Sequence, residues 1–202
     1  EILSFIPVEK NVEVMLVTIT NTGRMAQTVT PTAAIPLYGR SADNIRDHRH
    51  VTSLLHRIET TDIGVLVTPT LSFDERGHQV NHMTYYCVGW SGNGEKPVDF
   101  YPTAEDFVGE GGNFERPYAI VKNAEGVKAG TRIEGLEAVG GLHFSEVTLE
   151  PEEECSYLIF TGITEDIQEI RNLSKTYTTR EMVLEELEKT KAYWQEKVNV
   201  AY

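Results

Sequence analysis

Short strand-like runs, each followed by turn residues, are the feature that most constrains the fold of this 202-residue chain. The run Val12–Thr20 (VEVMLVTIT) is rich in β-branched residues, and the Asn21-Thr22-Gly23 segment that follows it is typical of turns. About eight to ten such runs succeed one another at the spacing expected of a sandwich. The pattern therefore predicts a mainly β fold of two antiparallel sheets.

The other expected strands are less regular. We expect them at residues 2–8, 26–35, 51–58, 65–71, 83–90, 142–149 and 155–161. Pro31 and Pro36 predict that residues 26–35 form an edge or bulged strand, because proline cannot donate to a ladder. Residues 51–58 and 65–71 are expected to pair as a hairpin, and residues 74–77 to form a further turn.

The end of the chain has a helical pattern. Ile167, Ile170 and Leu173 would share one face of a short helix over residues 164–173. Thr178 and Glu181 have the spacing of a capping box, and the helix after them would place Val183, Leu187, Trp194 and Val198 on one face. We therefore divide the chain into a β-sandwich (residues 1–163) and a helical linker (residues 164–202). The alternative is a C-terminal helix that covers one sheet of the same domain.

Residues 36–58 (PLYGRSADNIRDHRHVTSLLHRI) contrast with the chain as a whole, whose formal net charge is −13. This stretch holds four arginines and three of the six histidines against two aspartates. Arginine and histidine donors suit anions, or the hydroxyls and ring oxygens of sugars. The alternative is a salt-bridged surface loop of little energetic weight.

Residues 98–121 are aromatic, glycine-rich and acidic without clear periodicity. We expect a long ordered loop with one helical turn capped by Thr103. Within it, Gly109, Glu110, Gly111 and Gly112 predict a tight backbone path that lets main-chain groups approach a neighbour closely.

Composition and motifs exclude several classes of function. The excess of acid argues against non-specific nucleic-acid binding, and the longest apolar run is far shorter than the roughly 20 residues of a membrane span. Cys87 and Cys155 are expected to be buried free thiols in a reducing, cytoplasmic compartment. His48 and His50 form a possible metal-binding pair without a third ligand at a diagnostic spacing, so we expect no metal and no organic cofactor.

Three segments carry a resemblance to a known family: residues 36–58, TPTLSFDERGH, and FYPTAEDFVGEGGNFERPYAIV with its D-F-x-G-E-G-G motif. They resemble the amino-terminal region of the glycoside phosphorylases of glycoside hydrolase family 94, formerly glycosyltransferase family 36. The similarity is greatest to 1,2-β-oligoglucan phosphorylases and to the related part of cyclic β-1,2-glucan synthases. FIPVEKNVEVMLVTITNTG is similar to a strand pair of that family, and KAYWQEKV is similar to its linker helix.

The resemblance implies a galactose-mutarotase-like, two-sheet antiparallel supersandwich with a C-terminal linker helix, followed by an (α/α) barrel. It further implies that some strands of the sandwich precede Glu1. Such enzymes are hexosyltransferases that cleave β-glucosides with inorganic phosphate and invert the anomeric centre to give α-glucose 1-phosphate. Their general-acid Asp lies in the barrel, so this chain would be a non-catalytic part. The implied partners are a β-linked gluco-oligosaccharide, the protein's own catalytic barrel and a second subunit in a homodimer.

The resemblance also implies substrate-proximal residues. These are Arg40, Asp47, His48, Arg49 and His50, together with Gly109, Glu110, Gly111 and Gly112 on the same edge. A structural network at the domain interface is the alternative role for each. Two other functions remain open: a stand-alone carbohydrate-binding or dimerisation module, and part of a carbohydrate-modifying hydrolase with a similar sandwich.

Overall fold

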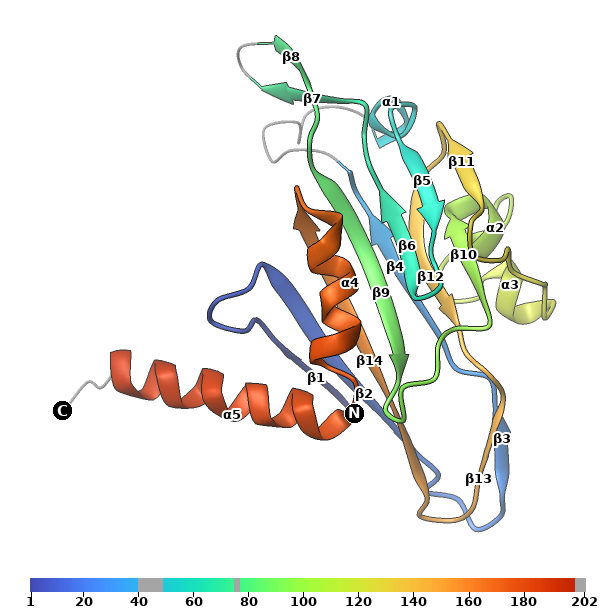
Figure 1. Cartoon of the computed structure of the whole chain (residues 1–202). Helices are drawn as coiled ribbons and strands as arrows, with labels where there is room; N and C mark the ends of the chain where they lie inside the picture. Colours follow the sequence, from blue (N-terminus) through green and yellow to red (C-terminus); the bar gives the residue numbers. More distant parts are fainter. Residues whose placement is uncertain (40–48, 75–76, 199–202) are drawn as a thin grey trace.

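The computed structural model describes residues 1–39, 49–74 and 77–198, which form fourteen strands and five helices. A large antiparallel sheet has seven strands in the spatial order β1-β2-β14-β9-β6-β5-β11 (Figure 1). Their bounds are β1 Ile2–Phe5, β2 Val12–Thr20, β14 Glu154–Thr164, β9 Thr84–Ser91, β6 Gly64–Val67, β5 Arg57–Thr60 and β11 Arg132–Glu134. The predicted mainly β, antiparallel fold is confirmed.

Three smaller sheets complete the β structure. A three-stranded sheet, β10-β12-β4, packs against the large one. Two-stranded ribbons, β13-β3 and β7-β8, extend from opposite ends of the molecule (Figure 1). The bounds are β10 Asp99–Thr103, β12 Ala138–His143, β4 Thr32–Leu37, β13 Val147–Leu149, β3 Gln27–Val29, β7 Leu71–Asp74 and β8 Gly77–Val80.

Strand β9 lies at the centre of the large sheet and is buried on both faces. Tyr86, Val88 and Trp90 alternate along one face and belong to the core under the helices. Cys87 points the other way, into the core between the two sheets. Because side chains alternate across a strand, a sequence apolar at successive positions can fill two cores at once.

The two sheets are in close contact where β12 passes β9. A Cβ built on Gly140 would lie 2.2 Å from Cβ of Cys87 and 2.7 Å from its Sγ. The Cys87 thiol also contacts the Gly140 carbonyl, with 3.6 Å between sulfur and oxygen. Only glycine fits at position 140, and this contact sets the local spacing of the sheets.

Helix α4 (Ile167–Thr176) packs over β9 and β14 on the outer face of the large sheet (Figure 1). The side chain of Asp166 caps it by accepting a hydrogen bond from the backbone nitrogen of Gln168. Ile170 and Leu173 are buried as expected, whereas Ile167 is 44% exposed. After the helix, the buried Tyr177 accepts a hydrogen bond at its carbonyl from Trp90 Nε1 at 2.7 Å, which fixes the end of α4 on the sheet.

Helix α5 (Arg180–Lys197) continues across the same face and extends beyond the sheet (Figure 1). Val183 and Leu187 in its first half are buried, but Trp194 is 54% exposed. The predicted capping box at Thr178 is wrong, because the helix begins one residue later with Thr179 as N-cap. The Thr178 hydroxyl instead contacts the sulfur of Met182 at 3.2 Å.

Two other local predictions are corrected. Residues 51–58 are not one strand: helix α1 (Arg49–Ser53) occupies the start, and only β5 (Arg57–Thr60) pairs with β6. The segment expected to be a loop from residue 98 begins with strand β10 and continues through α2 (Ala104–Val108) and α3 (Tyr118–Val121). Thr103 does cap α2, as predicted.

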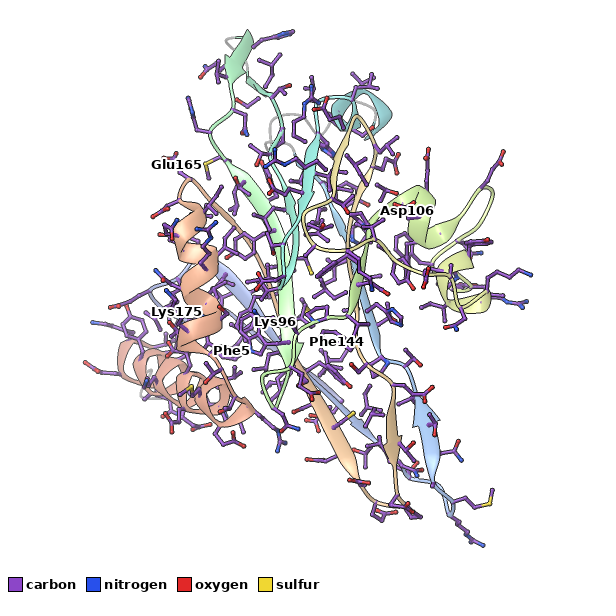
Figure 2. All side chains as sticks on the ribbon, turned by 45° about the vertical axis from the view of Figure 1, so that its right-hand side comes forward. Phe5, Lys96, Asp106, Phe144, Glu165 and Lys175 are labelled. Atoms are coloured by element: carbon purple, nitrogen blue, oxygen red, sulfur yellow. The ribbon has the colours of Figure 1, made fainter. Side chains whose placement is uncertain are left out.

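The helices lie on both sides of the paired sheets. Tyr101 on the outer face of the three-stranded sheet packs against Phe107 of α2 and Ala119 of α3. Figure 2 shows Asp106 on this side and Lys175 of α4 on the opposite side, with Phe144 between them. The architecture is therefore a helix layer, a large sheet, a small sheet and a second, smaller helix layer.

Candidate functional site

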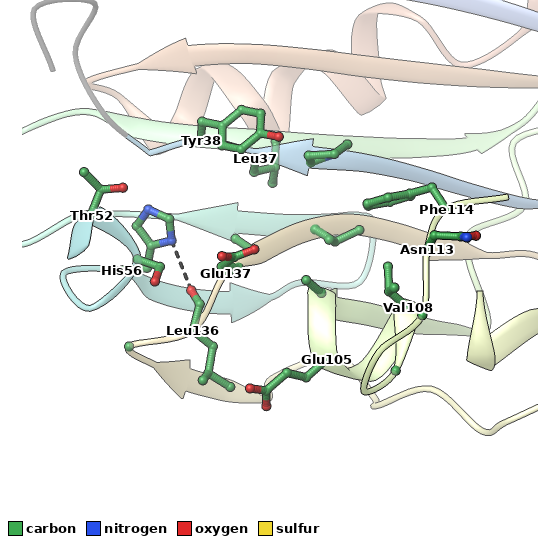
Figure 3. A pocket seen from close by; sticks show the side chains of 18 of the residues that line it. Leu37, Tyr38, Thr52, His56, Glu105, Val108, Asn113, Phe114, Leu136 and Glu137 are labelled. Atoms are coloured by element: carbon green, nitrogen blue, oxygen red, sulfur yellow. Dashed lines mark hydrogen bonds between the residues drawn. The ribbon is translucent and has the colours of Figure 1, made fainter. Parts of the chain in front are cut away.

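A cavity of about 640 Å³ lies at one end of the three-stranded sheet (Figure 3). Four segments that are distant in sequence line it: the end of β4, the α1–β5 connection, α2 with the turn after it, and the approach to β12. Its described lining residues are Pro36, Leu37, Tyr38, Thr52, Ser53, Leu54, His56, Ala104, Glu105, Val108, Gly109, Gly111, Gly112, Asn113, Phe114, Gly135, Leu136, Glu137, Ala138 and Val139. The volume is in the range of small-molecule sites.

The α2 wall is fixed by local backbone chemistry. The hydroxyl of Thr103 accepts from the backbone nitrogen of Asp106 at 3.0 Å and donates to its carboxylate at 2.7 Å. Helix α2 ends at Gly109, whose φ of +78° favours glycine and whose Cβ, if present, would lie 2.6 Å from Cβ of Tyr118. Asp106 therefore helps to fix the start of α2.

His56 lies at one end of the cavity and is only 4% exposed. Its Nδ1 lies 3.1 Å from the carbonyl oxygen of Leu136, which can only accept, so we assign the proton to Nδ1 (Figure 3). The buried Nε2 has no hydrogen-bond partner among the described residues. Burial lowers the pKa of His56 and therefore favours its neutral form. The backbone of Leu136 and of Gly39 and the Glu137 carboxylate have smaller effects, which raise the pKa.

Two carboxylates and two aromatic rings also line the cavity. Glu137 and Glu105 line it, and no lysine or arginine does so among the described residues. Tyr38 and Phe114 are about half exposed. The Phe114 ring packs on Phe107 with 5.8 Å between centroids, which connects it to the buried aromatic cluster below.

The predicted site residues are partly brought together. Gly109, Gly111 and Gly112 line the cavity, and Glu110 is exposed beside it. Arg49 and His50 lie in α1, which leads into the lining residues of the α1–β5 connection, but their side chains lie outside the described part of the structure. Arg40, Asp47 and His48 also lie outside the described residues. A substrate-proximal role for all nine residues stays a prediction.

Sequence reasoning missed most of the cavity's polar groups. Glu137 stands in no motif, and Tyr38 lies in the stretch 36–58 but was not predicted as a site residue. Only the fold brings the two beside α2. The aromatic content of residues 98–121 was the one available signal for Phe114, because exposed aromatic residues in an ordered loop often contact ligands.

A second polar pair lies on the outer face of the three-stranded sheet. His143 Nδ1 and Asp99 Oδ1 are 2.6 Å apart on directly paired residues of β12 and β10, and both side chains are largely buried. Lys128 Nζ lies 3.9 Å from the other carboxylate oxygen. The pair is balanced within the chain and lines no cavity that we find among the described residues, so we assign it a structural role.

Two kinds of feature are absent from the described residues: a metal-binding cluster and a membrane-spanning helix. Among the described residues, no group of three histidine, cysteine or carboxylate side chains could hold a metal ion. None of the helices in the described part is long and apolar enough to cross a membrane.

The fold defines the class of protein first: a mainly β, antiparallel supersandwich with a C-terminal helix. The sequence of residues 1–180 then matches the family described as glycosyl hydrolase 94, supersandwich domain. The chain therefore belongs to this family. No curated protein sequence matches the chain significantly.

Proposed function

We propose that this chain is the non-catalytic sandwich domain of an inverting β-glucan phosphorylase. In this role it shapes the substrate site of a catalytic barrel that belongs to the same protein, with inorganic phosphate as co-substrate and a β-linked gluco-oligosaccharide as substrate. The family match over residues 1–180 carries the proposal. The similarity of residues 36–58 and 106–112 to oligoglucan phosphorylases favours β-1,2-linked glucans.

The juxtaposition of two motifs supports this assignment. The glycine-rich turn of residues 109–112 and the end of α1 border the same cavity, although more than 50 residues separate them in sequence. A concave site of this size with aromatic and carboxylate groups suits carbohydrate recognition. We therefore propose that this face of the domain is turned towards the glycan.

The second half of α5 supports a connecting role for that helix. Trp194 and Val198 expose 54% and 59% of their surface although both are large and apolar. Such residues at the end of an extended helix suit contact with a neighbouring domain. We propose that this neighbour is the catalytic barrel. We further propose that the full-length protein is a homodimer and that it is cytoplasmic.

The experiment is to incubate the full-length protein with inorganic phosphate and a panel of β-linked gluco-oligosaccharides, and to measure α-glucose 1-phosphate. The proposal predicts phosphate-dependent release, with β-1,2-linked substrates the best. Release of glucose without phosphate would identify a hydrolase instead. Absence of any glycan turnover would favour a stand-alone binding or dimerisation module.

A substitution in the full-length protein tests the arginine- and histidine-rich segment. Arg49→Ala should raise the Michaelis constant for glucan or phosphate, because a charge-assisted donor is lost. Unchanged kinetics and unchanged stability would reject a substrate-proximal role for Arg49.

A further inference from the structure

We propose that the open edge of strand β4 is a docking site for one extended strand, and that the segment of the same protein preceding Glu1 provides this strand. The strand would pair with the backbone of Thr32 and Ala34 and cover an apolar part of the large sheet. The expectation that strands precede Glu1 leaves their position open, whereas the edge of β4 assigns one. This docking site goes beyond the proposed function and does not depend on it.

The two edges of the three-stranded sheet differ. At one edge, Phe100 of β10 exchanges backbone hydrogen bonds with Val127, at 2.9 and 2.8 Å between nitrogen and oxygen. At the other edge, β4 pairs with β12 alone within the described residues, and no backbone group in that part of the chain bonds to its outer side. This outer side is the open edge, and a further strand can pair there.

The register of β4 identifies the backbone groups that point towards the open edge. The Phe144 nitrogen donates to the carbonyl of Pro31, the residue before β4, at 3.0 Å. Because bonded and non-bonded pairs alternate along an antiparallel ladder, the N–H and C=O groups of Thr32 and Ala34 point away from β12. Pro36 is the next outward position, where its missing N–H does not interrupt the ladder with β12.

An apolar floor lies on the large sheet beside the open edge. Because β12 packs over β6 and β9 and β4 packs over β9, the next place in the small sheet lies over β14, β2 and β1. The floor consists of Ile2, Met15, Val17 and Ile19 on the inner face, where Val17 pairs with Ile2 and with the buried Tyr157. Ile2 is nevertheless 68% exposed, and the other three are only partly buried. Uncovered apolar side chains beside an open strand edge favour the addition of a strand.

The shape of the site favours a single extended segment over a second folded copy. Only one layer is open beside β4, because β14, β2 and β1 occupy the layer that faces it. A second copy that paired its own β4 here would bring either its large sheet or its α2–α3 layer into the space of these three strands. A lone strand needs only backbone pairing with β4 and apolar residues at alternate positions that face the floor.

The position of Glu1 favours the preceding segment as the source of this strand. Glu1 and Thr18 exchange backbone hydrogen bonds of 2.9 Å, so β1 starts at the border of the floor, whereas α5 lies on the outer face of the large sheet (Figure 1). Phe144, beside the start of β4, packs on Tyr157, the partner of Val17, with 4.6 Å between ring centroids. The starts of β1 and β4 therefore lie at the same end. A short connection into Glu1 requires the added strand to run antiparallel to β4.

The test compares the full-length protein with the 202-residue chain. Hydrogen exchange resolved by residue should be about 100-fold slower, or more, at Thr32 and Ala34 in the full-length protein, because paired amides exchange only when the structure opens. The amide of Ala33, which faces β12, should be protected in both proteins and is the internal control. Photo-methionine at Met15 of the floor should cross-link to a peptide that precedes Glu1, identified by mass spectrometry.

Two proline substitutions separate the open edge from the ladder with β12. Ala34→Pro removes an outward donor, as Pro36 does in the natural sequence, and should remove most of the slowing at Thr32 in the full-length protein. It should leave the exchange of Thr32 in the 202-residue chain unchanged. Ala33→Pro is the matched control, because it removes a donor to β12 and should destabilise both proteins alike. Thermal unfolding checks that each variant folds.

Three results would overturn the proposal. Equal exchange of Thr32 and Ala34 in the two unsubstituted proteins would reject the docking site, whatever the variants do. Cross-links from Met15 only to residues after Tyr202 would reject the preceding segment as the occupant. Cross-links between isotopically labelled and unlabelled subunits would identify a second copy instead. Phosphorolysis plays no part in these measurements, so their failure and the failure of the proposed function are distinguishable.

Discussion

The substitution Gly140→Ala tests the packing of the two sheets most sharply. The new methyl carbon would lie 2.2 Å from Cβ of Cys87, whereas carbon atoms in contact are normally about 3.5–4.0 Å apart. Relief of this clash needs a local separation of about 1.3–1.8 Å between two strands whose neighbours are already close-packed. Rotamer change cannot provide it, because both atoms are attached directly to the backbone.

Overpacking of a well-packed core typically costs 1–3 kcal/mol. Neither β12 nor β9 can move without the strands paired with it, so we expect Gly140→Ala to lower the free energy of unfolding by about 3 kcal/mol, the upper end of this range. For a domain of this length that corresponds to a fall in melting temperature of roughly 6–12 °C. Denaturant and thermal unfolding followed by circular dichroism measure both quantities.

A double-mutant cycle with Cys87→Gly identifies the cause. This second substitution removes the atoms with which the new methyl group collides, so Gly140→Ala should cost at least about 1 kcal/mol less in its presence. The reasoning would be refuted if Gly140→Ala changed stability by less than about 0.5 kcal/mol, or if the two substitutions were simply additive.

Three further predictions concern buried groups. Because folding lowers the pKa of His56, the unfolded chain binds more protons than the folded chain below pH about 6.5, so wild-type stability should fall as the pH drops from there towards the folded pKa. His56→Gln should flatten this part of the plot of stability against pH. An unchanged slope would contradict a lowered pKa for His56. Trp90→Phe removes the donor to the Tyr177 carbonyl and should lower the free energy of unfolding by about 1–3 kcal/mol in denaturant titrations, whereas a neutral effect would show that this hydrogen bond does not hold the end of α4. Burial raises the pKa of Cys87 to about 12, so a thiol reagent should modify only Cys155 in the native protein and both cysteines after denaturation; two fast-reacting native thiols would disprove the buried position of Cys87.

Several parts of the fold could be predicted from local sequence. Strand β2 has the predicted bounds, because its β-branched run and the turn after it act over a few residues. The cap of α2 by Thr103 and the pairing of β5 with β6 depend on equally local chemistry.

Other parts depend on contacts that the sequence does not reveal. Strand β10 (DFYPT) is buried along its whole length and contains proline, so it shows neither alternation nor a clear apolar run. The start of residues 51–58 was predicted as a strand but belongs to helix α1, because the pattern of a short apolar segment fits a helix or a strand equally well. Glu137 reaches the cavity only through the pairing of β12 with β4 and β10, a long-range contact that leaves no local signal.

The most direct test is a crystal structure of the full-length protein with a bound β-linked gluco-oligosaccharide. Our account predicts that the glycan contacts the face of this domain that carries the cavity between α1 and α2. A glycan bound without any contact to this face of the domain would contradict it.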